Sequence, residues 1–158
     1  MMAQFPGMGD PLPQVALTAP DGTAIDLAQF AGRKLVLFFY PKDDTPGCTT
    51  ENIDFSALAG EFDKAGTALL GISKDSPARH LKFAAKHNLA APLASDAETG
   101  GLSDALGIWR EKQNYGRTYL GMVRATYLIG ADGKIARVWS PVKVKGHAAE
   151  VLEAAKAI

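Results

Sequence analysis

Cys48 is the only cysteine among the 158 residues, and its surroundings favour a reactive sulfur. It directly follows the tripeptide Thr45-Pro46-Gly47. Threonine is a common helix N-cap and proline is favoured in the first turn, so we expect Cys48 in the first turn of a helix. The free N–H groups and partial positive charge of a helix N-terminus favour the thiolate, which is the nucleophilic form. Gly47 leaves the backbone open to a small substrate, and the Thr45 hydroxyl can donate and accept hydrogen bonds.

The elements that must position Cys48 are a buried strand before it and a helix after it. The run KLVLFFY at 34–40 predicts a strand buried on both faces, ended by Pro41. Apolar residues with helical spacing predict one helix from Cys48 to Gly66. Further strands are expected at 68–73, 89–94, 125–129 and 134–139, and further helices at 77–87, 98–106 and 147–158. This order predicts an α/β fold in one domain over 1–158, with a mixed central sheet flanked by helices in a thioredoxin-like arrangement.

Composition excludes several classes of function. Lys plus Arg and Asp plus Glu each number 17, which gives no reason to expect nucleic acid or an anionic membrane as a partner. No apolar run approaches the roughly 20 residues of a membrane span, and residues 1–10 lack the pattern of a signal peptide. A single cysteine excludes an intrachain disulfide and a cysteine-rich metal site. We therefore expect a cytoplasmic protein without metal or cofactor.

The sequence resembles the peroxiredoxins at Pro41, Thr45 and Cys48, which match their signature of Pro, three residues, Thr or Ser, two residues, Cys. The stretch FFYPKDDTPGCTTE is similar to the bacterioferritin comigratory protein, or peroxiredoxin Q, branch. Similar segments follow in order at 71–76, 115–116, 121–126 and 143–147. The resemblance thus covers nearly the whole chain and implies the thioredoxin fold and a thiol-dependent peroxidase.

The resemblance also implies roles for individual residues. Cys48 would attack the O–O bond of a hydroperoxide, Thr45 would hydrogen-bond the peroxide and the sulfur, and Pro41 would shield the pocket from water. Arg124 would hold the thiolate and the peroxide oxygens, a role that suits a permanently charged group with several donors in a fixed fork. Glu51, one turn beyond Cys48, resembles the family's acidic residue that orients this arginine.

The sequence departs from this branch at the resolving cysteine. Many members carry a second cysteine five residues after the first, where this chain has Ile53, or on the following helix, at about Ala84. The sulfenic acid formed on Cys48 would therefore need a thiol from outside: glutathione, thioredoxin, glutaredoxin or Cys48 of another subunit. We expect a monomer or weak homodimer. Two alternatives remain open: a redox sensor whose Cys48 oxidation state controls partner binding, and a non-catalytic thioredoxin-fold binding module.

Other polar residues receive simpler interpretations. Asp43 and Asp44 are interpreted as solvated residues that shape the turn before the helix. The stretch around Tyr115, Tyr119 and Met122 is interpreted as a loop. No specific role is assigned to the three histidines, His80, His87 and His147.

Overall fold

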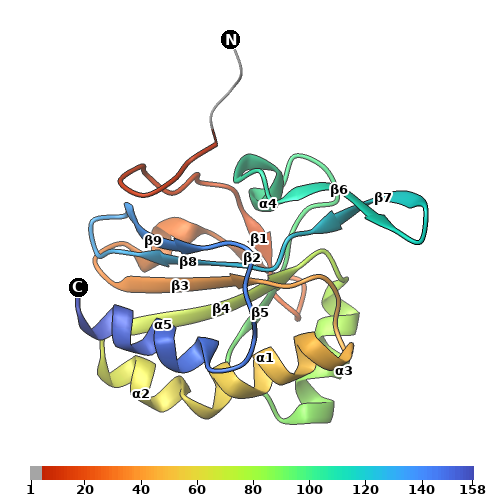
Figure 1. The fold of residues 1–158 in the computed structure, drawn as a ribbon. Helices are drawn as coiled ribbons and strands as arrows, with labels where there is room; N and C mark the ends of the chain where they lie inside the picture. The colour runs from red at the N-terminus through yellow and green to blue at the C-terminus, as the bar shows by residue number, and fades with distance from the viewer. Residues whose placement is uncertain (1–4) are drawn as a thin grey trace.

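The computed structural model describes residues 5–158, so the first four residues of the predicted domain lie outside it. Its centre is a seven-stranded mixed sheet with the strand order β2-β1-β5-β4-β3-β8-β9 (Figure 1). The pairs β3–β4 and β4–β5 are parallel, and the other neighbours are antiparallel. The strands of this sheet are β1 (Leu17–Thr18), β2 (Ala24–Ile25), β3 (Lys34–Phe39), β4 (Thr67–Ser73), β5 (Leu93–Ser95), β8 (Ala125–Ile129) and β9 (Ile135–Trp139).

Helices cover one face of the sheet, and the N-terminal segment with two short helices covers the other (Figure 1). The strand β3 divides its side chains between these two layers: Leu35 and Leu37 join one apolar cluster, and Val36 and Phe38 join the other. The expectation of a strand buried on both faces is confirmed, as is the mixed sheet flanked by helices. The helices are η1 (Leu27–Phe30), α1 (Pro46–Ala57), α2 (Ala59–Lys64), α3 (Pro77–His87), α4 (Leu102–Ala105) and α5 (His147–Lys156).

Three of the expected helices and strands differ from the sequence prediction. The single helix expected up to Gly66 is interrupted at Leu58, whose N–H bonds Phe55 O and whose backbone leaves the helical conformation, so α1 and α2 are separate. The strand expected over 89–94 is shorter and lies at Leu93–Ser95 (β5). The helix expected over 98–106 is also shorter and covers only Leu102–Ala105 (α4). The Asp96 carboxylate explains the late start of α4, because it accepts the N–H groups of Leu102 and Ser103.

The stretch interpreted as a loop is instead a two-stranded hairpin, β6 (Trp109–Asn114) with β7 (Arg117–Met122). Tyr115 and Gly116 both have positive φ, 52° and 75°, the geometry of the two-residue turns that fit the twist of hairpin strands. The hairpin projects from the body of the fold (Figure 1). Most of its side chains are exposed, so no apolar alternation marked these strands in the sequence.

The hairpin expected around residues 130–133 is confirmed as β8 and β9.

Within residues 5–158, no helix is both long enough and apolar enough to cross a bilayer.

Candidate active site

Cys48 lies in the first turn of α1, immediately after the loop that leaves β3. Pro46 is the first helical residue and Thr45 is the N-cap, with the Thr49 N–H bonding Thr45 O at 2.8 Å. The Thr45 hydroxyl does not cap the helix; it donates to Lys42 O at 2.8 Å. The Cys48 side chain is only 1% exposed, so the helix start presents a sulfur that is shielded from bulk water.

Sheet pairing brings Arg124 to this helix start, although it is 76 residues away in the sequence. Arg124 lies in the short link between β7 and β8, and β8 pairs with β3 so that Ala125 is opposite Phe39, the last residue of that strand. The guanidinium Nη2 donates to the Cys48 sulfur at 3.4 Å. The Val142 N–H donates to Arg124 O at 2.9 Å, which anchors the backbone of Arg124.

Glu51 holds the other end of the same guanidinium. Arg124 Nη1 donates to Glu51 Oε1 at 2.6 Å, and the Glu51 side chain is 1% exposed. Glu51 Oε2 is buried and meets no hydrogen-bonding group within the described chain. Burial raises the pKa of Glu51 to about 7, against the opposing effect of Arg124. Burial lowers the pKa of Arg124, but Glu51 and Cys48 outweigh it, so the Arg124 pKa is raised.

Gly47 gives Arg124 the space that it needs. A Cβ placed on Gly47 would lie 3.2 Å from Arg124 Nη2, the nitrogen that bonds the sulfur. Such a contact is tighter than almost all real Cβ contacts, so the guanidinium would have to move. A glycine at position 47 therefore permits the close approach between the helix start and Arg124.

Gly47→Ala is therefore expected to slow the oxidation of Cys48 by peroxide by roughly tenfold, because a small displacement of a charge-stabilising group is costly. The rate is measured by rapid mixing of reduced protein with peroxide. Gly60→Ala is the matched control: Gly60 is in α2, no described atom lies within 4 Å of its added Cβ, and alanine there should stabilise the helix by about 0.5–1 kcal/mol. Equal peroxide rates in Gly47→Ala and the parent would show that the Arg124 position is not limiting.

The raised pKa of Glu51 predicts a pH-dependent stability. Between the unfolded value near 4.5 and the folded value of about 7, the folded chain holds a proton that the unfolded chain releases. This contribution to the unfolding free energy is complete below about pH 4.5 and is lost as the pH rises through 7. Glu51→Gln should remove it, so the difference in unfolding free energy, parent minus variant, should fall between pH 4.5 and 7. Denaturant titrations across that range measure the difference, and a flat or rising difference contradicts the assignment.

The other two residues expected at the site, Pro41 and Thr45, make no hydrogen bond to the sulfur among the described residues. Pro41 follows β3 and is exposed, and Thr45 is half-buried. The two positions at which the family resemblance led us to expect a second cysteine differ in their surroundings: Ile53 is 44% exposed, whereas Ala84 packs against the apolar cluster that contains Cys48. The roles of Pro41 and Thr45 remain predictions.

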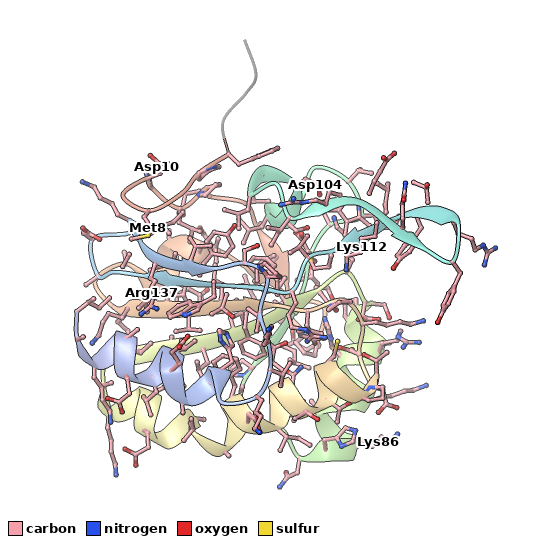
Figure 2. All side chains as sticks on the ribbon, in the orientation of Figure 1. Met8, Asp10, Lys86, Asp104, Lys112 and Arg137 are labelled. Atoms are coloured by element: carbon pink, nitrogen blue, oxygen red, sulfur yellow. The ribbon has the colours of Figure 1, made fainter. Side chains whose placement is uncertain are left out.

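Lys112 on β6 is a charged neighbour that sequence reasoning missed. Its ammonium donates to Met122 O, and its stem lies across Gly121. Burial and Arg124 lower the pKa of Lys112, and Cys48 opposes them, so the Lys112 ammonium shares the electrostatic environment of the sulfur and the guanidinium. In Figure 2 the Lys112 side chain points from the hairpin toward the body of the fold. Nothing in the polar sequence WREKQN distinguished this lysine from a solvated one.

Asp43 is a correction to the sequence interpretation. It was expected to be solvated, but it is 2% exposed because Tyr40 and His80 enclose its carboxylate with hydrogen bonds. Asp44 is on the surface as expected, where it accepts from Lys86 and contacts His87. No group of three or more metal-ligating side chains occurs in the part of the chain that the structure describes.

Comparisons with known proteins show which family the chain belongs to. A profile of the AhpC/TSA family matches residues 8–138. The chain is 48% identical over 141 residues to Peroxiredoxin Bcp of Xanthomonas campestris, covering 89% of this chain and 88% of that protein. It is 40% identical to Peroxiredoxin Bcp of Bacillus subtilis, covering 94% of each.

Solved structures extend the similarity to three dimensions. A structure of X. campestris Peroxiredoxin Q has a TM-score of 0.88 at 45% identity, covering 95% of this chain and 97% of that one. Structures of that protein include serine variants at two different cysteine positions. A cysteine-to-serine variant of Xylella fastidiosa PrxQ has a TM-score of 0.90 at 37% identity, covering 98% of each chain. The expected thioredoxin-like fold is thereby confirmed. The chain belongs to the AhpC/TSA family and is a peroxiredoxin, a peroxidase of the Bcp or peroxiredoxin Q kind.

Proposed function

We propose that the Cys48 thiolate attacks one oxygen of a hydroperoxide and cleaves its O–O bond. An Sγ–O bond forms, the bonding electrons of O–O pass to the distal oxygen, and that oxygen takes up a proton and leaves as an alcohol or water. Cys48 is oxidised to sulfenic acid and the peroxide is reduced. The observation that carries this proposal is the guanidinium of Arg124, which contacts the sulfur with one nitrogen and a buried carboxylate with another.

Arg124 and Thr45 supply complementary hydrogen bonds in this step. Negative charge develops on the leaving oxygen, and fixed N–H donors lower the barrier where that charge appears. The Thr45 hydrogen is already donated to Lys42 O, so the hydroxyl oxygen keeps its lone pairs for the O–H of an incoming hydroperoxide. Glu51 keeps the guanidinium in place, Gly47 leaves room for it, and Pro41 limits the access of water.

The substrates that we propose are hydrogen peroxide and organic hydroperoxides. A solved structure of the X. campestris bacterioferritin comigratory protein concerns alkyl peroxide reduction, and that protein is 45% identical to this chain. Because the Cys48 sulfur is buried, only the –O–O–H group of a peroxide needs to enter the site. The organic part of a larger peroxide can remain outside.

Recycling requires a thiol that this chain does not contain. With Ile53 and Ala84 at the two resolving positions, the sulfenic acid on Cys48 has no intrachain partner. We propose that thioredoxin, glutaredoxin or glutathione attacks it, which forms an S–S bond, releases water and leaves a mixed disulfide that a second thiol reduces.

Without added thiol, the protein is therefore expected to consume one equivalent of peroxide per chain, and excess peroxide should convert Cys48 to sulfinic acid. Added glutathione, or thioredoxin with its reductase, should restore multiple turnovers through an adduct on Cys48. Peroxide consumption measures the number of turnovers, and the intact mass of the protein identifies the oxidised form or the thiol adduct of Cys48. Rapid, complete formation of a disulfide-linked dimer that thioredoxin reduces would replace this route with one between subunits.

A further inference from the structure

A buried polar network outside the reacting groups joins Tyr40, Asp43 and His80. The Tyr40 hydroxyl donates to Asp43 Oδ1 at 2.6 Å, and His80 Nδ1 lies 2.7 Å from Asp43 Oδ2. All three side chains are at most 2% exposed. Buried polar groups persist in folded proteins when they are hydrogen-bonded, and removing one partner costs the desolvation of the other. The network therefore opposes any separation of its members.

The hydrogen-bond partners of His80 determine how many protons the network holds. His80 Nε2 lies 3.0 Å from Ala94 O, and because a carbonyl only accepts, Nε2 carries a hydrogen. A second hydrogen must lie between Nδ1 and the Asp43 carboxylate, since two lone pairs at 2.7 Å would repel each other. Whichever atom holds that hydrogen, the bond pairs charged or strongly polar groups in a buried site, which is the stronger class of hydrogen bond.

The network connects the loop before Cys48 to two other elements. Asp43 belongs to the loop that runs from the end of β3 to Thr45, and its N–H donates to Asp75 Oδ2 at 2.8 Å, beyond the end of β4. His80 belongs to α3, which lies beside this loop in Figure 1. The outer edge of the network is charged, because Arg79 pairs with Asp75 at 3.1 Å.

We propose that Asp43 and His80 are positioning residues that hold the loop of residues 43–45, and with it the first turn of α1, in the closed arrangement that buries the Cys48 sulfur. This proposal rests on the function proposed above. While the network is intact, Thr45 and the first turn of α1 stay where a peroxide meets the sulfur, and larger molecules do not reach Cys48. When it is broken, the exposed contacts of Asp44 with Lys86 and His87 are too weak to keep the loop on α3. The sulfur then loses its alignment for peroxide but becomes accessible to bulky thiol reagents.

Two substitutions of His80 separate this role from mere filling of the core. An asparagine amide at position 80 can take the place of Nδ1 and keep the bond to Asp43. A glutamine amide reaches the place of Nε2 and keeps only the bond to Ala94 O. We expect His80→Gln to slow peroxide oxidation of Cys48 about tenfold and to speed its labelling by a bulky maleimide about tenfold, while His80→Asn stays closer to the parent in both rates. A general loss of stability would affect Asn and Gln variants alike.

If His80→Gln does not fold, two variants of Asp43 give the same comparison. Asp43→Asn can still accept from Tyr40 and donate to a neutral His80, whereas Asp43→Ala can do neither. Opposite changes of the two rates, confined to Asp43→Ala and His80→Gln, support the proposal; equal effects in each matched pair, or no effect, overturn it. If the parent does not react with peroxide but the labelling differences persist, the proposed function fails and the closed loop stands. If the parent reduces peroxide and no variant changes labelling, only the proposal on the loop fails.

Discussion

Cys48→Ser is expected to reduce peroxide consumption below detection. A serine hydroxyl is not ionised near neutral pH, and oxygen is a poor nucleophile toward peroxide oxygen. The place at the start of α1 and the hydrogen-bond donors around it therefore cannot make up for the missing thiolate. The fold should survive, because serine is close to cysteine in volume, with a loss of about 1 kcal/mol for a hydroxyl in a buried site. Peroxide consumption with thiol present measures the activity, and thermal unfolding measures the fold.

Thr50→Ser is the control for Cys48→Ser. Thr50 is exposed on the same helix, where its hydroxyl bonds Pro46 O, and the shorter side chain keeps that hydroxyl. It should retain the parent activity. Residual peroxidase activity in Cys48→Ser comparable to the parent would show that the reaction does not use this sulfur.

Arg124→Gln is expected to slow the oxidation of Cys48 by roughly 100-fold or more, since it removes a fixed positive donor where negative charge develops. Arg124→Lys keeps the charge but loses the fork that bonds Cys48 and Glu51 together, so an intermediate rate is expected. The rate constant for the first oxidation step, from rapid mixing, is the relevant quantity because recycling does not enter it.

Two further variants make the Arg124 result interpretable. Arg124→Gln leaves the buried Glu51 carboxyl without its partner, so it lowers the stability of the protein as well as the oxidation rate. The double variant Arg124→Gln/Glu51→Gln separates the two effects, because it removes the unpaired group. It should regain stability but not the oxidation rate. Arg137→Gln, an exposed arginine over the Trp139 ring, should react like the parent. Parent-like oxidation in Arg124→Gln would contradict the role of Arg124.

The parts that could be predicted from the sequence are those encoded by local pattern. The apolar run of β3, the Thr45-Pro46 helix start and the turn at 130–133 are decided by neighbouring residues, and each forms as expected. The meeting of Cys48 with Arg124 is not local, and only the family resemblance brought them together across 76 residues.

The parts that were missed depend on distant partners. Asp43 resembles any polar loop residue until His80, 37 residues later, encloses it in the folded chain. Lys112 resembles a solvated lysine until the link after β7 brings Arg124 beside it. The hairpin of β6 and β7 carried a turn signal at Tyr115-Gly116, but its exposed, charged strands lacked the apolar alternation that marks a half-buried strand.

The most direct measurement is the mass of the reduced chain after rapid mixing with one equivalent of hydroperoxide in the absence of thiol. Fragment masses then locate the change. A gain of one oxygen atom, confined to the peptide that contains Cys48 and formed as fast as peroxide disappears, is the predicted result. An unmodified Cys48 after the peroxide has been consumed, or oxygen gained mainly on methionine, would contradict the attack of this sulfur on the O–O bond.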